Sequence, residues 1–139
     1  MPTVSRAFLK SGMVYLLLGL LAGLAQPLGV LLNWGWLAYV PLPTYVHLIV
    51  VGWLTQLIFG VAFWMFPKYS KENPLGSPGL AWATFGLLNV GLALRVIAEP
   101  AVTANAGGWA HGMLVISAVL QWGAGMTFIA NTWRRVRPI

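Results

Sequence analysis

The chemistry of this chain is sought first in its two histidines, His47 and His111, because each lies inside a long apolar segment. An ionisable side chain in such a segment is costly to bury and generally has a function. Imidazole nitrogens bind metal ions and cofactor metals. The sequence contains no cysteine, which excludes disulfides, Cys-ligated zinc, iron–sulfur clusters and thiol catalysis. The two histidines are therefore the leading candidate ligands.

The composition is that of a membrane protein, since 59% of the 139 residues are hydrophobic and 7% are charged. A soluble domain carries about 25% charged residues to cover its surface. Intrinsic disorder requires low hydrophobicity and high charge, which is the opposite balance. The net charge of +6 does not indicate nucleic-acid binding, because the basic residues are few and lie at the ends of apolar runs.

Four apolar segments are each long enough to cross a bilayer, which takes about 20 residues in a helix. Pro67 closes the second segment, and Gly107 and Gly108 precede the fourth. The first segment is too long for a signal peptide and lacks a convincing cleavage site. The sequence predicts an all-α, integral-membrane, up-down-up-down four-helix bundle that forms a single domain. The predicted spans are about 7–32, 44–66, 78–97 and 109–133.

The distribution of Lys and Arg predicts the orientation of the bundle. With four spans, seven of the eight basic residues fall on one side: Arg6, Lys10, Lys68, Lys71, Arg134, Arg135 and Arg137. The eighth, Arg95, falls on the other side. Because loops rich in Lys and Arg remain in the cytoplasm, both termini are expected there. We expect a multi-pass protein of a bacterial or archaeal-type inner membrane.

The two histidines are expected at matching depth near the outer face. His47 and His111 each lie near the start of a span that runs inward. In an up-down-up-down bundle these two spans are diagonal neighbours, and helix axes about 8–10 Å apart put diagonal axes roughly 12–14 Å apart. That gap suits a b-type haem whose iron is bound by one imidazole on each face. A bare zinc ion needs three or four ligands, and no carboxylate is expected within a span. The alternative is that each histidine only hydrogen-bonds a neighbouring helix.

Several outer residues are candidates for contacts with the haem. Arg95 could bind a propionate, since a guanidinium suits a carboxylate. Its alternative role is an ion pair with Glu99, four residues on in the helix. Four aromatic residues could line the macrocycle or simply belong to the interfacial aromatic belt; they are Trp34, Trp36, Tyr45 and Trp109.

The glutamines and glycines inside the spans predict how the helices pack. Gln56 follows His47 by nine residues, which puts it about half a turn round an α-helix from His47, so it should not face the same cofactor. Gln56 and Gln121 are expected to form interhelical or inter-subunit hydrogen bonds. Gly19 and Gly23 form a G-x-x-x-G pair, for which packing within the chain is favoured over dimer formation.

The second span carries a resemblance to a known family. It reads Tyr45-Val-His-Leu-Ile-Val-Val-Gly-Trp-Leu-Thr-Gln-Leu-Ile-Phe-Gly-Val-Ala-Phe-Trp-Met-Phe-Pro67. This resembles the second transmembrane helix of haem-copper oxidase and nitric oxide reductase catalytic subunits, and small four-span subunit I-like proteins. The resemblance implies a low-spin haem ligand at His47. The family's copper-site histidines have no counterpart here, so we expect no oxygen or nitric oxide reduction by one chain.

The sequence therefore predicts a membrane b-type haem protein with His47 and His111 as iron ligands. Its expected role is electron transfer or redox or gas sensing, with a respiratory donor or acceptor as partner. Whether haem is held within one chain or between copies in a homo-oligomer stays open. The alternative is a cofactor-free accessory or assembly subunit of a respiratory oxidase complex. A transporter is disfavoured, because no ionisable relay is expected mid-membrane.

Overall fold

A computed structural model describes residues 1–35, 40–70 and 76–136, and within these ranges the regular structure is entirely helical. Four helical rods are long and apolar enough to cross a membrane. The predicted all-α four-helix architecture is thus confirmed. The rods are α1 (Thr3–Leu31); the continuous α2 (Leu42–Val46), η1 (His47–Thr55) and α3 (Gln56–Met65); α4 (Pro78–Thr103); and α5 (Gly108–Thr132), extended by η2 (Trp133–Arg135).

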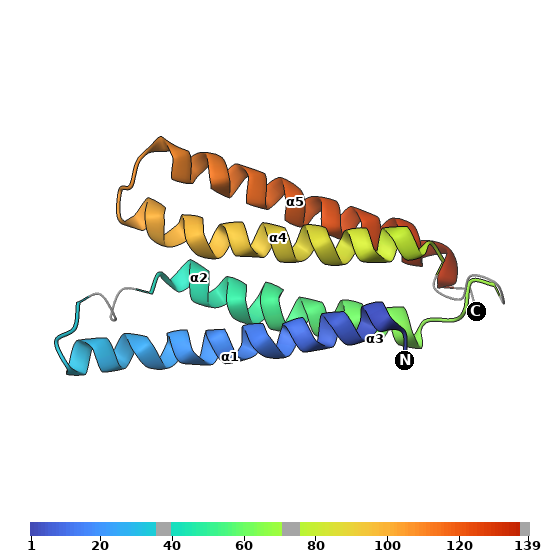
Figure 1. The fold of residues 1–139 in the computed structure, drawn as a ribbon, viewed down its shortest axis with the longest axis horizontal. Helices are drawn as coiled ribbons and strands as arrows, with labels where there is room; N and C mark the ends of the chain where they lie inside the picture. Colours follow the sequence, from blue (N-terminus) through green and yellow to red (C-terminus); the bar gives the residue numbers. More distant parts are fainter. Residues whose placement is uncertain (36–39, 71–75, 137–139) are drawn as a thin grey trace.

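The rods form two antiparallel hairpins that pack together. α1 lies along the α2–η1–α3 rod, and α4 lies along α5 (Figure 1). Both chain termini are at one end of the bundle, which we call the terminal end. The α1–α2 and α4–α5 connections are at the other end, which we call the distal end. The α2–η1–α3 rod meets α4 between the hairpins, so residues on these two rods can bridge them.

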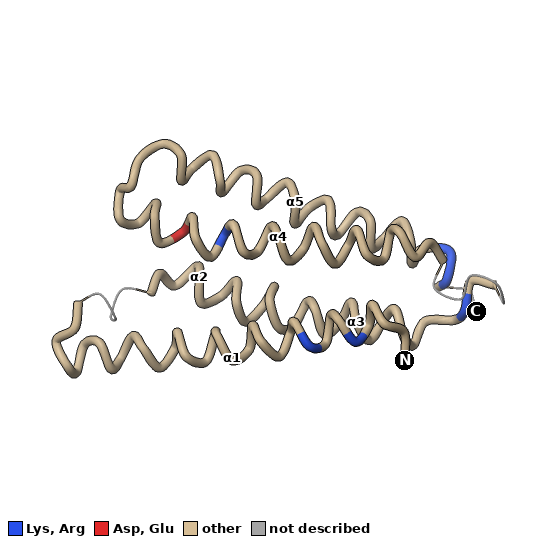
Figure 2. Tube along the Cα trace, in the orientation of Figure 1, with Lys and Arg blue, Asp and Glu red and all other residues tan. Residues whose placement is uncertain are grey.

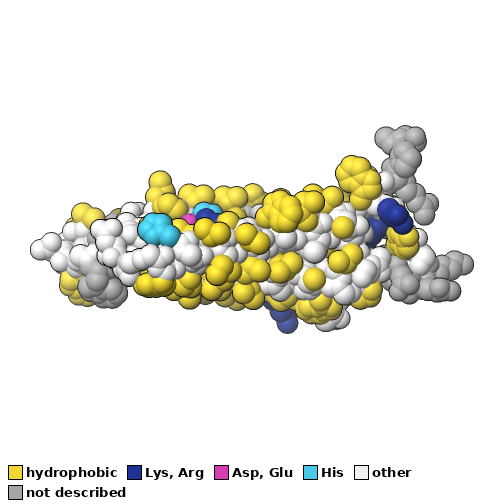
Figure 3. Space-filling view, turned by 90° about the horizontal axis from the view of Figure 1, so that it is seen from above, with side chains coloured by type: hydrophobic (Ala, Val, Ile, Leu, Met, Phe, Trp, Pro, Cys, Tyr) yellow, Lys and Arg dark blue, Asp and Glu magenta, His cyan; other side chains and the backbone are white. Residues whose placement is uncertain are grey.

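The described charges divide between the two ends. Most Lys and Arg positions lie toward the terminal end, whereas one basic and one acidic position lie together in the distal half of α4 (Figure 2). These two positions are Arg95 and Glu99. Exposed side chains over the rest of the helices are largely Leu, Val, Ile and Trp, and Figure 3 shows an apolar surface along the whole bundle. Such a surface suits contact with lipid.

Phenylalanine rings from all four rods hold the terminal half together. Phe59 of α3 stacks on Phe128 of α5 with ring centroids 3.9 Å apart. Phe8 of α1 meets Phe85 of α4 edge to face at 5.1 Å, and it also contacts Phe63 at 5.8 Å. Each such pair contributes about 0.5–1.5 kcal/mol beyond its buried area. The cluster fixes how the two hairpins sit against each other.

The second rod changes its winding along its length. η1 is a π-helix, whose hydrogen bonds run to the fifth residue rather than the fourth. The Thr55 hydroxyl donates to the Val50 carbonyl at 2.8 Å, which spans the same five residues. π segments inside α-helices occur frequently at functional sites. Here the segment begins at His47, and nothing in the sequence predicted it.

α4 continues beyond the predicted end of the third span. The sequence placed that end near Ile97, whereas the helix runs to Thr103 with Pro100 inside it. Proline lacks the N–H that continues a helix, but membrane helices tolerate it where neighbouring groups satisfy the backbone. The Thr103 hydroxyl donates to the Glu99 carbonyl at 2.8 Å across this turn. The longer helix carries Glu99 into the bundle.

Glycines allow α1 to approach the second rod closely, which confirms packing within the chain as the role of the G-x-x-x-G pair. A Cβ atom on Gly19 would lie 2.5 Å from Ile49 Cδ1, and one on Gly23 would lie 3.0 Å from the Tyr45 ring. A Cβ atom on Gly60 would lie 2.9 Å from Phe8 Cβ and 3.2 Å from the Ser5 carbonyl oxygen. Side chains at these positions would force the helices apart.

Replacement of Gly60 by alanine should destabilise the bundle. The added methyl group meets a Cβ atom and backbone, neither of which can rotate away, and such overpacking costs about 1–3 kcal/mol. The control is Gly125→Ala, where nothing lies within 4 Å of the new Cβ atom. Thermal unfolding in detergent should show a lower Tm for Gly60→Ala and an unchanged or higher Tm for Gly125→Ala. Equal Tm values would contradict the close packing of α1 on α3.

Candidate functional site

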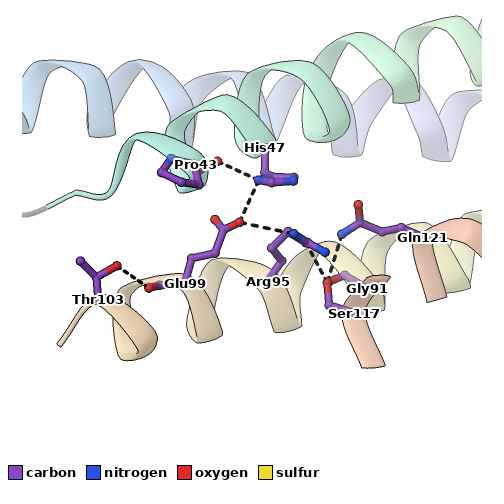
Figure 4. A network of polar contacts seen from close by, with 8 residues as sticks. All are labelled: Pro43, His47, Gly91, Arg95, Glu99, Thr103, Ser117 and Gln121. Atoms are coloured by element: carbon purple, nitrogen blue, oxygen red, sulfur yellow. Dashed lines mark hydrogen bonds and ion pairs between the residues drawn. The ribbon is translucent and has the colours of Figure 1, made fainter. Parts of the chain in front are cut away.

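A network of polar side chains joins three of the four rods in the distal half of the bundle (Figure 4). His47 comes from the start of η1, Arg95 and Glu99 come from α4, and Ser117 comes from α5. Arg95 and Glu99 are four residues apart and therefore lie on one face of α4. That face is turned toward η1, so the network forms where the two hairpins meet.

His47 is held through one ring nitrogen, Nδ1. This atom lies 2.8 Å from the Pro43 carbonyl oxygen and 2.9 Å from Glu99 Oε1. A carbonyl oxygen can only accept a hydrogen bond, so Nδ1 must carry the proton and donate it. The Pro43 contact spans one helical turn, and Pro43 itself lies in the first turn of α2. The other ring nitrogen, Nε2, then has a lone pair whenever the ring is neutral.

Glu99 is the acidic side chain at the centre of the network. Its residue is 7% exposed, and Oε1 lies 3.6 Å from Arg95 Nη1 as well as against His47. The charges of Arg95 and Glu99 balance each other, so a neutral His47 leaves the network without net charge. The second carboxylate oxygen, Oε2, is buried and makes no hydrogen bond within the described chain.

The Ser117 hydroxyl extends the network to α5. It donates to the Gly91 carbonyl at 2.7 Å, and it accepts from Arg95 Nε and from Gln121 Nε2, both at 3.1 Å. A hydroxyl can donate one hydrogen bond and accept two, so the Ser117 hydroxyl makes all the hydrogen bonds that it can. Gln121 therefore bonds within α5 and does not form the interhelical bond predicted for it.

Gln56 faces α4 on the same side as His47, so the predicted opposite orientation is wrong. Its side chain is fully buried and exchanges hydrogen bonds with Asn89, with Nε2 donating to Asn89 Oδ1 at 3.1 Å. The interhelical bond predicted for Gln56 is thus confirmed. The orientation differs because η1 has more residues per turn than an α-helix. The nine residues from His47 to Gln56 therefore rotate through a smaller angle about the helix axis than α-helical geometry predicts.

The structure brings only some of the predicted site residues together. His47 and Arg95 meet through Glu99. His111 is exposed near the start of α5 and lines a cavity of about 280 Å³ with the α4–α5 turn. No hydrogen bond or ion pair joins His47 to His111 in the described ranges. Histidine, acidic and basic side chains lie near one another toward the distal end of the face that Figure 3 shows.

The predicted aromatic residues have separate surroundings. Tyr45 packs against Gly23 of α1. Trp109 is exposed, and its indole N–H donates to the Ala106 carbonyl at 2.7 Å within the α4–α5 turn. Trp34 is exposed beyond the end of α1, and Trp36 lies outside the described residues. The contacts of Tyr45 and Trp109 do not link these two residues to the His47 network.

Glu99 is the residue that the sequence did not identify as part of the site, and its burial corrects the expectation that no carboxylate lies within a span. The i,i+4 spacing from Arg95 was the available signal. It was not decisive because Pro100 follows directly and a proline usually ends a helix. The burial of Glu99 depends on α4 continuing through that proline.

The hydrogen bonds of His47 suit a histidine that binds the metal of a cofactor. They do not indicate a site where protein side chains alone hold a metal ion. Metal-binding histidines generally donate their other ring N–H to a carboxylate or a backbone carbonyl, which fixes the ring and raises its basicity. His47 has both partners on Nδ1. No cluster of three or more His, Asp, Glu or Cys side chains that could hold a metal ion occurs in residues 1–35, 40–70 and 76–136.

Comparison with known proteins finds no matching protein-family model, no matching curated protein and no matching solved structure. The interpretation of the site therefore depends on the geometry of the chain itself.

The Gln56–Asn89 pair should show thermodynamic coupling. Changing either residue alone to leucine takes a hydrogen-bond partner from the other, although Asn89 keeps its bond to the Phe85 carbonyl, whereas changing both removes the pair. Couplings of this kind in membrane helices average about 0.6 kcal/mol and reach about 1.7 kcal/mol. Unfolding of Gln56→Leu, Asn89→Leu and the double variant in detergent should give a double-variant loss smaller than the sum. Strictly additive losses would contradict the contact and the orientation of Gln56.

Proposed function

We propose that this multi-pass membrane protein binds a b-type haem near its distal end, with His47 Nε2 as one axial ligand to the iron. One observation carries the proposal, namely that Glu99 and Pro43 both engage Nδ1 of His47. This leaves Nε2 as the coordinating atom and fixes the plane of the ring. A structural histidine on a helix needs neither a second acceptor nor a buried carboxylate.

Glu99 has a defined part in this proposal. A carboxylate on Nδ1 gives the imidazole more anionic character and makes Nε2 a stronger donor. The negative charge also favours the more highly charged ferric state of an iron nearby. Arg95 holds the carboxylate from the other side at 3.6 Å, so the oxygen that faces His47 is kept in place. Glu99 and Arg95 are therefore positioning residues, and His47 is the ligand.

His111 is the proposed second axial ligand. Its side chain is exposed and forms no hydrogen bond with the described residues, so both ring nitrogens are available. His47 of one chain could be paired with His111 of the same chain or of a second copy. The resemblance of the second span to the low-spin haem helix of haem-copper oxidase subunits agrees with this assignment at His47.

A bound haem supplies one-electron redox chemistry, and the chain's own residues determine how it is used. If His47 and His111 both bound the iron, electron transfer or redox sensing would be favoured over direct oxygen chemistry. The Lys and Arg side chains of the terminal end favour a cytoplasmic location for both termini, which would put the site near the outer face, within reach of a respiratory donor or acceptor.

The second candidate function is a cofactor-free accessory or assembly subunit of a respiratory complex. It is favoured by one observation: Glu99 and Ser117 already engage Arg95. The guanidinium would have to leave these partners to bind a haem propionate. In this alternative the His47 network serves only to lock the two hairpins together.

Visible spectroscopy distinguishes the two functions. The full chain, expressed with ample haem and purified in detergent, should show the sharp α-band of a low-spin b-type haem in its reduced-minus-oxidised spectrum. His47→Ala should lose this haem or convert it to the high-spin form. The matched control is Val46→Ala, which truncates the exposed neighbouring side chain and should keep the wild-type spectrum.

Two results would refute the proposal. A colourless wild-type protein would favour the accessory subunit. Unchanged spectra in both His47→Ala and His111→Ala would exclude these histidines as the ligands, even if haem is bound elsewhere.

The charge of Glu99 should set the reduction potential. Glu99→Gln keeps an oxygen acceptor for Nδ1 but removes the negative charge, so the ferric state loses stabilisation and the potential rises. A tenfold change in the equilibrium constant between the ferric and ferrous states corresponds to about 59 mV for one electron. Gln121→Leu, which changes the far end of the network, is the control. Redox titration that gives Glu99→Gln the wild-type potential would rule out the role assigned to Glu99.

A further inference from the structure

A second candidate site, a mainly apolar cavity with cationic residues in its lining, lies at the terminal end, away from the histidines. A cavity of about 590 Å³ is formed by the start of α1, the end of α3 and the start of α4. Most of its lining is apolar, including Val4 and Phe63, and two tryptophans, Trp64 and Trp82, form part of its wall. Two cationic residues also line it, Lys68 and Arg135. No acidic residue is among the described residues that line it, and an apolar cavity with cationic lining suits an amphipathic anion.

Arg135 is buried deeply for a charged side chain, with 2% of its surface exposed. Its Nε donates to the Pro67 carbonyl at 3.0 Å, and its Nη2 donates to the carbonyls of Phe63 at 3.1 Å and Phe66 at 2.9 Å. These carbonyls end α3, where the helix itself provides no donors. Arg135 therefore caps α3 from the end of the fourth rod.

The cap leaves part of the guanidinium without a partner. Nη1 is buried and makes no hydrogen bond with the described residues. Carbonyl dipoles do not cancel a full charge, and an uncompensated buried cation is strongly unfavourable. Glu99, the acidic residue that the structure describes, is in the distal half, and Glu72 lies outside the described residues. Among the described residues, none supplies an anion to Nη1.

Lys68 and the two tryptophans indicate where this anion comes from. Lys68 is exposed and follows α3 directly, so its flexible ammonium can reach the mouth of the cavity. Trp64 is 55% exposed and Trp82 is 46% exposed, which opens the cavity to the outside of the bundle. Tryptophan rings on membrane helices lie at the depth of the lipid headgroups. At this depth the abundant anionic group is the phosphate of a phospholipid.

We propose that the cavity binds the phosphate of an anionic membrane phospholipid, with Arg135 and Lys68 as its cationic partners and Trp64 and Trp82 beside the glycerol and the upper acyl chain. The bound phosphate compensates the charge of Arg135 and so stabilises the cap that joins α3 to the end of α5. This site is independent of the haem proposal, because the two share no residue and lie at opposite ends of the bundle.

Native mass spectrometry of the full chain in detergent tests the site. Phosphatidylglycerol is titrated into wild type, Lys68→Gln and Arg134→Gln. Arg134 neighbours Arg135 but lies outside the cavity lining, so it is the matched control for loss of one charge. Lys68→Gln should weaken phosphatidylglycerol binding about fivefold, as expected for one cation at an anionic headgroup, and Arg134→Gln should change it less than twofold. Arg135 itself is not changed, because loss of its cap could unfold α3.

The same titration identifies the ligand. Binding of phosphatidylglycerol that equimolar inorganic phosphate does not displace supports a lipid. Full displacement by inorganic phosphate would show that the site takes free phosphate, and it would overturn the lipid assignment. Equal effects of Lys68→Gln and Arg134→Gln, or equal binding of phosphatidylglycerol and the zwitterionic phosphatidylcholine, would show nonspecific attraction and overturn the site.

Discussion

The contact between Glu99 and His47 is the interaction on which the rest of the distal half depends. It joins the two hairpins through a carboxylate that is 7% exposed and lies 2.9 Å from the ring nitrogen. In an apolar environment such a group must find its partners within the protein. Arg95 balances its charge, and Ser117 carries the network to α5. The ring orientation of His47 follows from this requirement.

The two ends of the bundle are stabilised in different ways. Phenylalanine rings from all four rods pack in the terminal half, where Arg135 also caps α3. Polar side chains join the rods in the distal half. This half lies beyond the phenylalanine cluster, and here the second rod includes a π-helix. A π segment and a buried ion pair both cost stability, and proteins generally keep such features at functional sites. This contrast between the two halves supports the proposal that the distal half holds the functional site.

The sequence was sufficient for the four helices, because long apolar segments with few charges have no other stable form in lipid. It also predicted the Gln56 hydrogen bond and the close approach at Gly19 and Gly23, since both depend on residue type within a known helix. It missed the burial of Glu99, because local rules end a helix before Pro100. It misplaced the face of Gln56, because a π segment is set by packing and has no local signal.

The most direct test of the account is the protonation of the two ring nitrogens of His47, measured by ¹⁵N NMR on histidine-labelled protein in bilayers without added haem. His111→Ala removes the only other histidine signal. The account predicts a proton on Nδ1, hydrogen-bonded to Glu99, and an unprotonated Nε2 that is ready to coordinate iron. A proton on Nε2 with an unprotonated Nδ1 would contradict it, because neither Pro43 nor Glu99 could then hold the ring.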